Sequence, residues 1–332
     1  MKYKEIGSEF WDVPLGKTCN QIFPISTQWY ISGRSALQAI IMEIEDFHTV
    51  ALPSWCCDSI IQPFIDAGKE IHFYPVYWKD GLIQEIDLNR DVLFIMDYFG
   101  YTNQTIDLSG YRGTVVRDVT HSIFSFTYLD ADYYFGSLRK WCGVWTGGYA
   151  WTRNEHKLPI GEKDDGPYAA LRNMAMNMKR NYIEGNGDKG YLKFFEDAED
   201  CLENIGVAPA EDRDIKLALK LDIEGTRRAR RTNAEVLRKA FPDWLVFPEM
   251  RDSDCPMFVP VFVPDGKRDA LRRYLIEHEI YCPVHWPASE YHKLDEKTEY
   301  LYKNELSLVC DQRYAVEDMN RMVEMIHEFI GE

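Results

Sequence analysis

The chain has 332 residues, of which 45% are hydrophobic and 14% aromatic, and this composition excludes a disordered protein. Its formal net charge of −16 makes nucleic acid an unfavourable partner unless a local basic patch overrides the field. The length favours one large domain with a smaller second one. We predict a large domain over 1–225, with an N-terminal arm, and a small C-terminal domain over 226–332.

The basic residues, cysteines and apolar segments show which classes of protein the sequence does not favour. The one basic run, RRARR at 227–231, is flanked by acidic residues in a helix-like stretch, and we interpret it as a solvated or interface face. Eight cysteines occur without a C-x-x-C pair, which favours free thiols in a reducing cytoplasm and predicts no metal site. The first ten residues lack an apolar segment, and no stretch is long enough to span a bilayer. We therefore expect a soluble cytoplasmic protein without a membrane partner.

The apolar pattern predicts an α/β fold. Continuous apolar strands separated by helices are typical of a mainly parallel sheet that is covered by helices on both faces. Ligands of such sheets bind beyond the carboxyl ends of the strands. A smaller C-terminal α+β domain follows the sheet. In chain order we expect a helix at 34–47, a strand at 49–54, a helix at 58–68 with Asp58 as its N-cap, strands at 70–76, 91–100, 113–122 and 131–137, long helices between about 168 and 240, a strand at 257–263, a helix near 267–278, a strand at 307–310 and a terminal helix near 316–330.

Two stretches contain residues suited to an anion and to a ring nitrogen. SGRSAL places Gly33, Arg34 and Ser35 at the start of a helix, where free N–H groups and the helix dipole favour a phosphate, although such residues are also ordinary caps. Asp118 ends a buried strand, with His121 three residues later. An aspartate there can keep a heteroaromatic nitrogen protonated, with the histidine as a hydrogen-bonding neighbour. Each residue taken singly also suits a turn cap or a satisfied boundary histidine.

A third stretch offers an amine. DYYFGSLRKW places Ser137 and Lys140 after an apolar strand that Gly136 interrupts. A partly buried lysine is the side chain that forms Schiff bases with carbonyl groups, and the serine can reach a phosphate on the same ligand. LPSWCCDS adds Trp55 after another strand, as a flat surface or as part of the core. A ligand with a phosphate, a pyridinium nitrogen and an aldehyde matches these requirements, and pyridoxal 5′-phosphate is such a ligand.

The order of these motifs resembles that of the fold-type-I enzymes that use pyridoxal phosphate, and most of all the DegT/DnrJ/EryC1/StrS aminotransferases of nucleotide-linked sugars. The resemblance covers about residues 30–150 and resumes further along the chain. The stretches that carry it are SGRSAL, LPSWCCDSIIQPFIDAGKEIHFYPV, IMDYFGYTNQTIDL, RDVTHS, SLRKW, RRTNAEVL (230–237), IYCPVHWP (280–287) and CDQRY (310–314).

The resemblance implies a role for each candidate residue. Lys140 would form the Schiff base with the cofactor, Asp118 would pair with the pyridine nitrogen, and His121 would lie near the ring hydroxyl. The phosphate would be held by Gly33, Arg34, Ser35 and Ser137, and the ring would stack in the stretch from Trp55 to Cys57. Arg313 and His285 are candidates for substrate binding. A homodimer also follows from the resemblance.

The implied activity is the transfer of an amino group from a donor such as glutamate to a keto sugar, nucleotide-linked, or to a similar small keto compound. The sequence departs from the family pattern in having Arg34 where threonine is usual and FGSLRK before and at the lysine. RNYIEG at 180–185 is the nearest match to a motif that enters the neighbouring subunit's site. A lyase or dehydratase on the same fold, and a non-catalytic binding module, remain alternatives.

Overall fold

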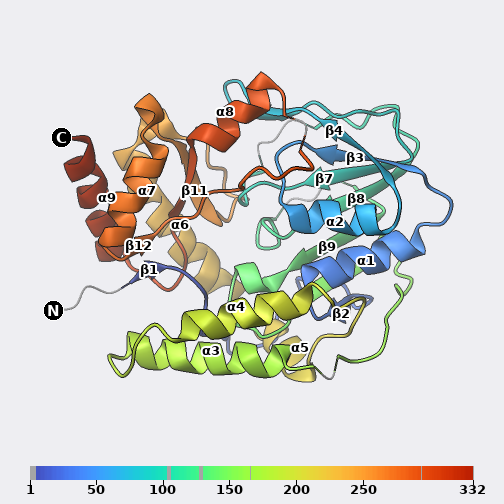
Figure 1. Cartoon of the computed structure of the whole chain (residues 1–332), viewed down its shortest axis with the longest axis horizontal. Helices are drawn as coiled ribbons and strands as arrows, with labels where there is room; N and C mark the ends of the chain where they lie inside the picture. Colours follow the sequence, from blue (N-terminus) through green and yellow to red (C-terminus); the bar gives the residue numbers. More distant parts are fainter. Residues whose placement is uncertain (1–4, 103–105, 127–129, 165, 293, 332) are drawn as a thin grey trace. The chain divides into compact units, whose positions relative to one another are not determined.

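The computed structural model of the chain describes residues 5–102, 106–126, 130–164, 166–292 and 294–331. Part of the IMDYFGYTNQTIDL stretch therefore lies outside the described residues. The chain divides into two compact units, each built from segments that are distant in the sequence (Figure 1). Unit 1 comprises 1–8, 47–130 and 224–332, and unit 2 comprises 9–46 and 131–223. The predicted division of the chain after residue 225 remains a prediction.

Unit 1 contains four parallel strands in the order β4-β3-β7-β8. Their bounds are Thr49–Pro53 (β3), Glu70–Tyr74 (β4), Val92–Met96 (β7) and Thr114–Asp118 (β8). The four strands predicted between 49 and 122 are thus confirmed. β7 ends earlier than expected because the chain turns at Phe99 and Gly100, whose φ angles are +54° and +82°. A Cβ on Gly100 would lie 2.0 Å from the carbonyl oxygen of Cys255, so only glycine fits this turn.

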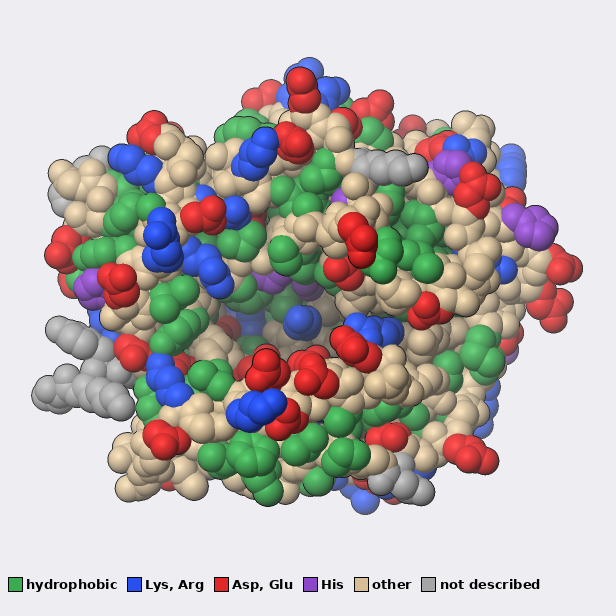
Figure 2. Space-filling view, in the orientation of Figure 1, with side chains coloured by type: hydrophobic (Ala, Val, Ile, Leu, Met, Phe, Trp, Pro, Cys, Tyr) green, Lys and Arg blue, Asp and Glu red, His purple; other side chains and the backbone are tan. Residues whose placement is uncertain are grey.

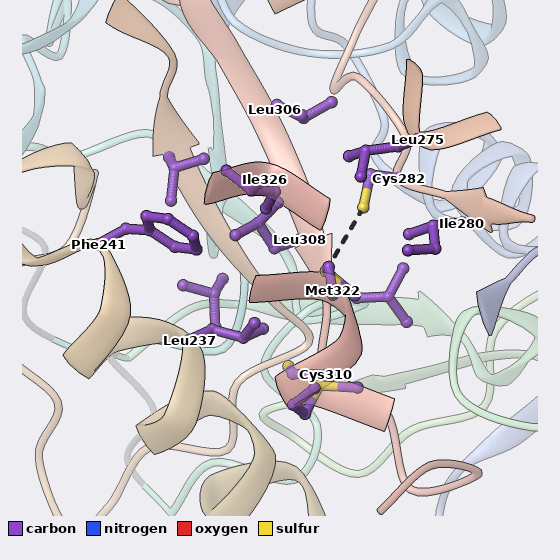
Figure 3. Packing of buried hydrophobic residues seen from close by; sticks show 14 of the residues in the cluster. Leu237, Phe241, Leu275, Ile280, Cys282, Leu306, Leu308, Cys310, Met322 and Ile326 are labelled. Atoms are coloured by element: carbon purple, nitrogen blue, oxygen red, sulfur yellow. Dashed lines mark hydrogen bonds between the residues drawn. The ribbon is translucent and has the colours of Figure 1, made fainter. Parts of the chain in front are cut away.

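The C-terminal part of unit 1 has its own apolar core. β11 and β13 pair antiparallel, and the short strands β1 and β12 pair parallel. Figure 3 shows side chains from these strands and from the helices around them converging, among them Leu237, Leu308 and Ile326, which are fully buried. The elements are β1 Ile6–Gly7, α6 Ile223–Ala240, β11 Phe258–Phe262, α7 Arg268–Glu277, β12 Ile280–Tyr281, β13 Glu305–Val309 and α9 Val316–Ile330.

The remaining elements of unit 1 lie along the chain between the strands and helices already named. They are α2 Asp58–Asp66, β5 Val76–Trp78, β6 Leu82–Gln84, the 3₁₀ turns η2 Pro242–Trp244 and η3 Pro264–Gly266, and α8 Glu296–Asn304. The N-cap of α2 is Cys57, which has extended backbone angles, so Asp58 lies in the first turn of the helix rather than at its cap. This corrects the cap that we expected from the sequence.

Unit 2 contains three antiparallel strands in the order β9-β10-β2. The predicted strand at 131–137 is confirmed by β9, and the predicted helix at 34–47 by α1. The helices α3 and α4 lie side by side as a hairpin (Figure 1). The bounds are Gln28–Tyr30 (β2), Gly33–Glu43 (α1), Tyr133–Ser137 (β9), Leu138–Lys140 (the 3₁₀ turn η1), Gly148–Thr152 (β10), Tyr168–Ile183 (α3), Tyr191–Leu202 (α4) and Asp212–Ala218 (α5).

The basic run at 227–231, which we interpreted as a solvated or interface face, is only partly exposed: Arg228 is exposed, but two of its arginines are buried. Arg227 and Arg230 are 6% and 1% exposed, and their guanidinium groups donate to backbone carbonyl oxygens and to one side chain. On the face drawn in Figure 2, basic side chains lie among acidic ones. None of the helices in the described part of the chain is long and apolar enough to cross a membrane.

Candidate functional site

In unit 1 the predicted Asp118 is the last residue of β8, and the predicted His121 follows it by three residues. Both are buried, with 5% and 4% of their surfaces exposed. The Oδ1 atom of Asp118 accepts a hydrogen bond from the N–H of Thr120 at 2.8 Å, which fixes the turn that leads to the histidine. His121 Nδ1 accepts from the N–H of Phe99 at 3.2 Å. Because Nδ1 is an acceptor, the proton of a neutral His121 ring lies on Nε2.

A buried ion pair supports the strand ends on which these residues lie. The Nε and Nη2 atoms of Arg117 donate to Asp97 Oδ1 at 2.9 and 2.6 Å, and the Ser122 hydroxyl donates to Asp97 Oδ2. Asp97 follows β7 and Arg117 directly precedes Asp118, so the pair joins two neighbouring strands of the parallel sheet. The sequence gave no signal for this ion pair, because the contact depends on strand register.

Trp55 lies inside an aromatic cluster of unit 1. It is fully buried, its ring stacks on that of Tyr98 at 5.0 Å between centroids, and its indole N–H donates to the carbonyl oxygen of His285 at 2.7 Å. These contacts match the core reading of Trp55. Cys57 is half-buried, and its Sγ lies 2.9 Å from Ser59 Oγ. The ring parallel to His121 is that of Trp286, at 5.8 Å, a residue that the sequence had not singled out.

His285, predicted as a substrate-binding residue, is held by two residues of β13. Its Nδ1 lies 2.8 Å from Ser307 Oγ, and its backbone N–H donates to Glu305 Oε2 at 2.9 Å. The Ser307 hydroxyl donates to Glu305 Oε1. Burial raises the pKa of Glu305 to about 8, even though Ser307, the N–H of His285 and Arg268 all lower it. A carboxyl, a hydroxyl and an imidazole thus form a buried chain that leads to the His285 ring.

Arg313, the other candidate for substrate binding, forms a buried ion pair. Its Nε and Nη2 atoms donate to the two carboxylate oxygens of Asp311 at 2.9 and 2.7 Å, and Nη2 also donates to the carbonyl oxygen of Ser8. Burial alone would raise the pKa of Asp311, but the Arg313 guanidinium holds it below its usual value. The structure therefore assigns these atoms of Arg313 to contacts within the chain.

In unit 2 the predicted anion-binding residues lie at the start of α1. Ser32 caps the helix by accepting from the N–H of Ser35 at 3.1 Å, and the buried Ser35 hydroxyl donates to the carbonyl oxygen of Gly206 at 2.6 Å. Arg34 is half-buried, and its Nη1 lies 3.5 Å from the carbonyl oxygen of Leu202. The N–H groups of Gly33 and Arg34 belong to the first turn of a helix, where no carbonyl of the same helix is in reach.

Unit 2 brings Gly33, Ser137 and the stretch containing Lys140 together. A Cβ on Gly33 would lie 3.2 Å from the Cβ of Ser137, so the start of α1 passes directly beside the end of β9. This approach also requires Gly148 on β10, where a Cβ would lie 1.9 Å from the carbonyl oxygen of Ser32. Lys140 ends the turn η1 three residues after Ser137, and its side chain is exposed. A helix N-terminus thus lies beside a hydroxyl from a distant part of the sequence, and an exposed amine follows that hydroxyl by three residues.

Unit 2 also holds a cluster that the sequence did not reveal. Arg139, Arg172 and Lys179 lie near Glu9, and the positive charges of all three, with that of Lys140, lower the pKa of Glu9, which burial alone would raise. These residues come from the arm before β2, from η1 and from α3. Contacts between such distant segments follow from packing rather than from a local pattern. In the described part of the chain no group of three or more His, Cys, Asp or Glu side chains could hold a metal ion.

Comparison with known proteins gives a result for structure alone. No protein-family model matches the sequence, and no curated protein matches it. One similar solved structure is Helicobacter pylori PseC, an aminotransferase involved in the biosynthesis of pseudoaminic acid. The similarity covers 97% of this chain and 99% of the PseC chain, with 14% identity and a TM-score of 0.65. A DegT DnrJ EryC1 StrS aminotransferase from Brucella abortus is similar over 92% of this chain and 86% of its own, with 15% identity and a TM-score of 0.62.

A third solved structure agrees with these two. The sugar aminotransferase Spr1654 from Streptococcus pneumoniae, described as putative and in its PLP form, is similar over 90% of this chain and 86% of its own. Its identity is 12% and its TM-score 0.59. The predicted fold class is thereby confirmed: the chain has the α/β fold, a mainly parallel sheet flanked by helices, of the fold-type-I sugar aminotransferases.

Proposed function

We propose that this protein is a pyridoxal-phosphate-dependent aminotransferase that moves an amino group from an amino acid such as glutamate to a keto sugar, nucleotide-linked, or to a similar small keto compound. The observation that carries this proposal is the amine of Lys140, which lies three residues after Ser137 in the unit that also contains the N-terminus of α1. The chain has the fold of solved aminotransferases. We also propose, from the resemblance, that it works in the cytoplasm as a homodimer.

The residues of unit 2 fit the phosphate end of the cofactor. The first-turn N–H groups of Gly33 and Arg34 and the hydroxyl of Ser137 are donors suited to an anion, and the close approach of Gly33 to Ser137 brings them to one place. The Ser35 hydroxyl already donates to Gly206, so we assign Ser35 a role in shaping this cradle through the helix cap. The half-buried Arg34 adds positive charge next to the cradle.

The residues of unit 1 fit the ring end. When bound, pyridoxal phosphate supplies an aldehyde for the lysine amine and a ring that takes up electrons from the substrate carbon. Asp118 would hold a proton on the ring nitrogen through its carboxylate, and His121, with its own proton on Nε2, would donate to the ring hydroxyl. Trp55 and Cys57 would border the ring, and His285 would face the acceptor.

Lys140 would have two tasks. Its Nζ atom would bind the aldehyde in the resting enzyme and, once released by the amino donor, would take the proton from the donor's α-carbon and return one to the product. The exposed position of the side chain at the end of η1 leaves it free to move between these tasks. These two tasks, binding the aldehyde and transferring a proton, would explain why a lysine follows β9.

The absorption spectrum of the purified protein tests the proposal. We expect a cofactor band near the visible edge that is lost or shifted in Lys140→Ala and retained in Lys157→Ala, which removes an exposed lysine elsewhere in unit 2. Added glutamate should convert the band to the shorter-wavelength form of the aminated cofactor. A band that ignores every amino acid would favour a lyase or dehydratase, and the absence of a band after cofactor is added would refute the enzyme.

A further inference from the structure

The cluster beside Lys140 in unit 2 is unusual in its burial. Arg172 and Lys179 lie seven residues apart on one face of α3, and they are 1% and 0% exposed. Glu9 and Glu199, the carboxylates nearest to Arg172, are 43% and 50% exposed. The cations are thus withdrawn from water, whereas their partners are not. Buried charges are costly unless they are well paired, so this arrangement requires a physical account.

The pairing of Arg172 within the chain is weak. Its Nη1 atom lies 3.4 Å from Glu9 Oε2 and 3.4 Å from Glu199 Oε1, whereas a charge-assisted hydrogen bond is normally about 2.7–2.9 Å long. Its buried Nε finds no hydrogen-bond partner among the described residues. The Nε of Arg139 is in the same situation, although Arg139 forms an ion pair with Glu199. A guanidinium has five N–H donors. In both Arg139 and Arg172, the Nε donor has no acceptor among the described residues.

Several positive charges gather around Glu9. Four cations, Arg139, Lys140, Arg172 and Lys179, act on its carboxylate. The carboxylate of Glu199 also acts on Arg139 and Arg172. Burial and the neighbouring Arg139 lower the pKa of Arg172, as expected for crowded cations.

We propose that this cluster is the subsite for a carboxylate of the amino donor, and that the carboxylate of Glu9 occupies it until the donor enters. The inference rests on the proposed function, because an amino donor carries its carboxylate on the same carbon as its amine. Glu9 marks where such a group is held: beside Arg172, and within the field of Lys140. Planar guanidinium groups with unused donors match the two oxygens of a carboxylate.

Glu9 is suited to leave when the donor arrives. Its side chain is 43% exposed and it precedes the first strand of unit 2, so the carboxylate can move into water without breaking a helix or strand. The donor carboxylate would then take over the contacts with Arg172 and use the donors that Glu9 leaves unused. Anchoring the carboxylate fixes the donor amine and α-carbon near Lys140, which lowers the entropic part of the barrier.

Binding of glutarate, a dicarboxylate without an amine, tests the subsite by titration calorimetry on the protein as purified. We expect Glu9→Gln to tighten binding about tenfold, because it removes the resident carboxylate, and Arg172→Gln to weaken it at least tenfold. Arg172→Lys keeps the charge but not the planar fork, and we expect it to weaken binding as well, which covers the case that Arg172→Gln does not fold. Lys193→Gln, which removes a 66% exposed cation on α4, is the matched control and should bind like the wild type.

The outcomes separate this proposal from the proposed function. Binding that needs Arg172 and tightens in Glu9→Gln supports the subsite even if no cofactor band is found, since glutarate cannot react. If glutarate binds with equal strength to all variants, or does not bind at all while glutamate still converts the cofactor, the subsite is refuted and the aminotransferase stands. Half-conversion concentrations for alanine and glutamate then assign the carboxylate. An equal rise for both in Arg172→Lys identifies the α-carboxylate, and a rise for glutamate alone identifies the distal one.

Discussion

The buried carboxyl group of Glu305 predicts that the stability of the protein falls as the pH rises, and that Glu305→Gln removes this dependence. Glu305 is 0% exposed and begins β13, where it accepts hydrogen bonds from Ser307 and from the N–H of His285. Burial raises its pKa from 4.5 to about 8. At neutral pH the folded chain therefore holds a proton on Glu305 that the unfolded chain has released.

The sign and size follow from proton linkage. Between about pH 4.5 and pH 8 the native state binds more protons at this site than the unfolded state, so the free energy of unfolding falls by up to about 1.4 kcal/mol for each pH unit. The contribution is complete below the unfolded pKa and is lost as the pH rises through the folded one. The loss over this window is on the order of 5 kcal/mol, a large share of the roughly 5–15 kcal/mol that stabilises a typical protein.

Thermal unfolding at several pH values between about 5.5 and 8.5 measures this effect. Glutamine has the shape of the protonated carboxyl and can keep both hydrogen bonds if the Ser307 hydroxyl reorients, but it does not titrate. We expect the midpoint of the wild type to fall relative to that of Glu305→Gln by about 1–2 °C for each kcal/mol lost. Glu296→Gln, at an exposed carboxyl on α8, should run parallel to the wild type. Curves of Glu305→Gln and the wild type that stay parallel would refute the reasoning.

Two further substitutions probe the frame around the site. Asp97→Asn should destabilise unit 1 by about 3–5 kcal/mol in denaturant unfolding, because it leaves the buried guanidinium of Arg117 without its counter-charge; the double variant Asp97→Leu with Arg117→Leu should recover part of the loss, and no recovery would argue against the ion pair as the cause. Gly148→Ala should cost more than about 3 kcal/mol or prevent folding, since its Cβ would lie 1.9 Å from the carbonyl oxygen of Ser32. The control Gly206→Ala, where a Cβ meets nothing within 4 Å, should unfold within about 0.5 kcal/mol of the wild type, and equal losses at both glycines would contradict the close approach.

The sequence predicted the part of the fold that local patterns determine. Buried parallel strands read as continuous apolar runs, so β3, β7 and β8 were found with their order along the chain, and the last residue of β8 is Asp118. A cap and a glycine before an apolar helix located the start of α1, next to which the structure places Ser137. These features depend on neighbours within a few residues, which a pattern records.

Contacts made by packing were not predicted. Glu305, Ser307 and His285 form one hydrogen-bonded chain because β13 meets the segment that follows β12, and no spacing in the sequence brings 285 to 307. Trp55 packs among the rings of Tyr98 and Phe99, and the sequence did not predict these neighbours. Arg313 was predicted to bind substrate, and its ion pair with Asp311, two residues away, was not predicted.

The two arginine clusters show why a charge run alone does not predict its own environment. Arg227, Arg230 and Arg231 of α6 donate to carbonyl oxygens of a loop over 251–257 that has no strand to pair with, so burial satisfies groups that would otherwise lack a partner. Arg172 of α3, by contrast, is as deeply buried, but its nearest carboxylates, those of Glu9 and Glu199, are half-exposed and lie 3.4 Å from its Nη1 atom. The first set completes the fold, whereas the second retains unused donors. The difference lies in the acceptors nearby, and it is this difference that makes Arg172 a candidate for binding and Arg230 a structural residue.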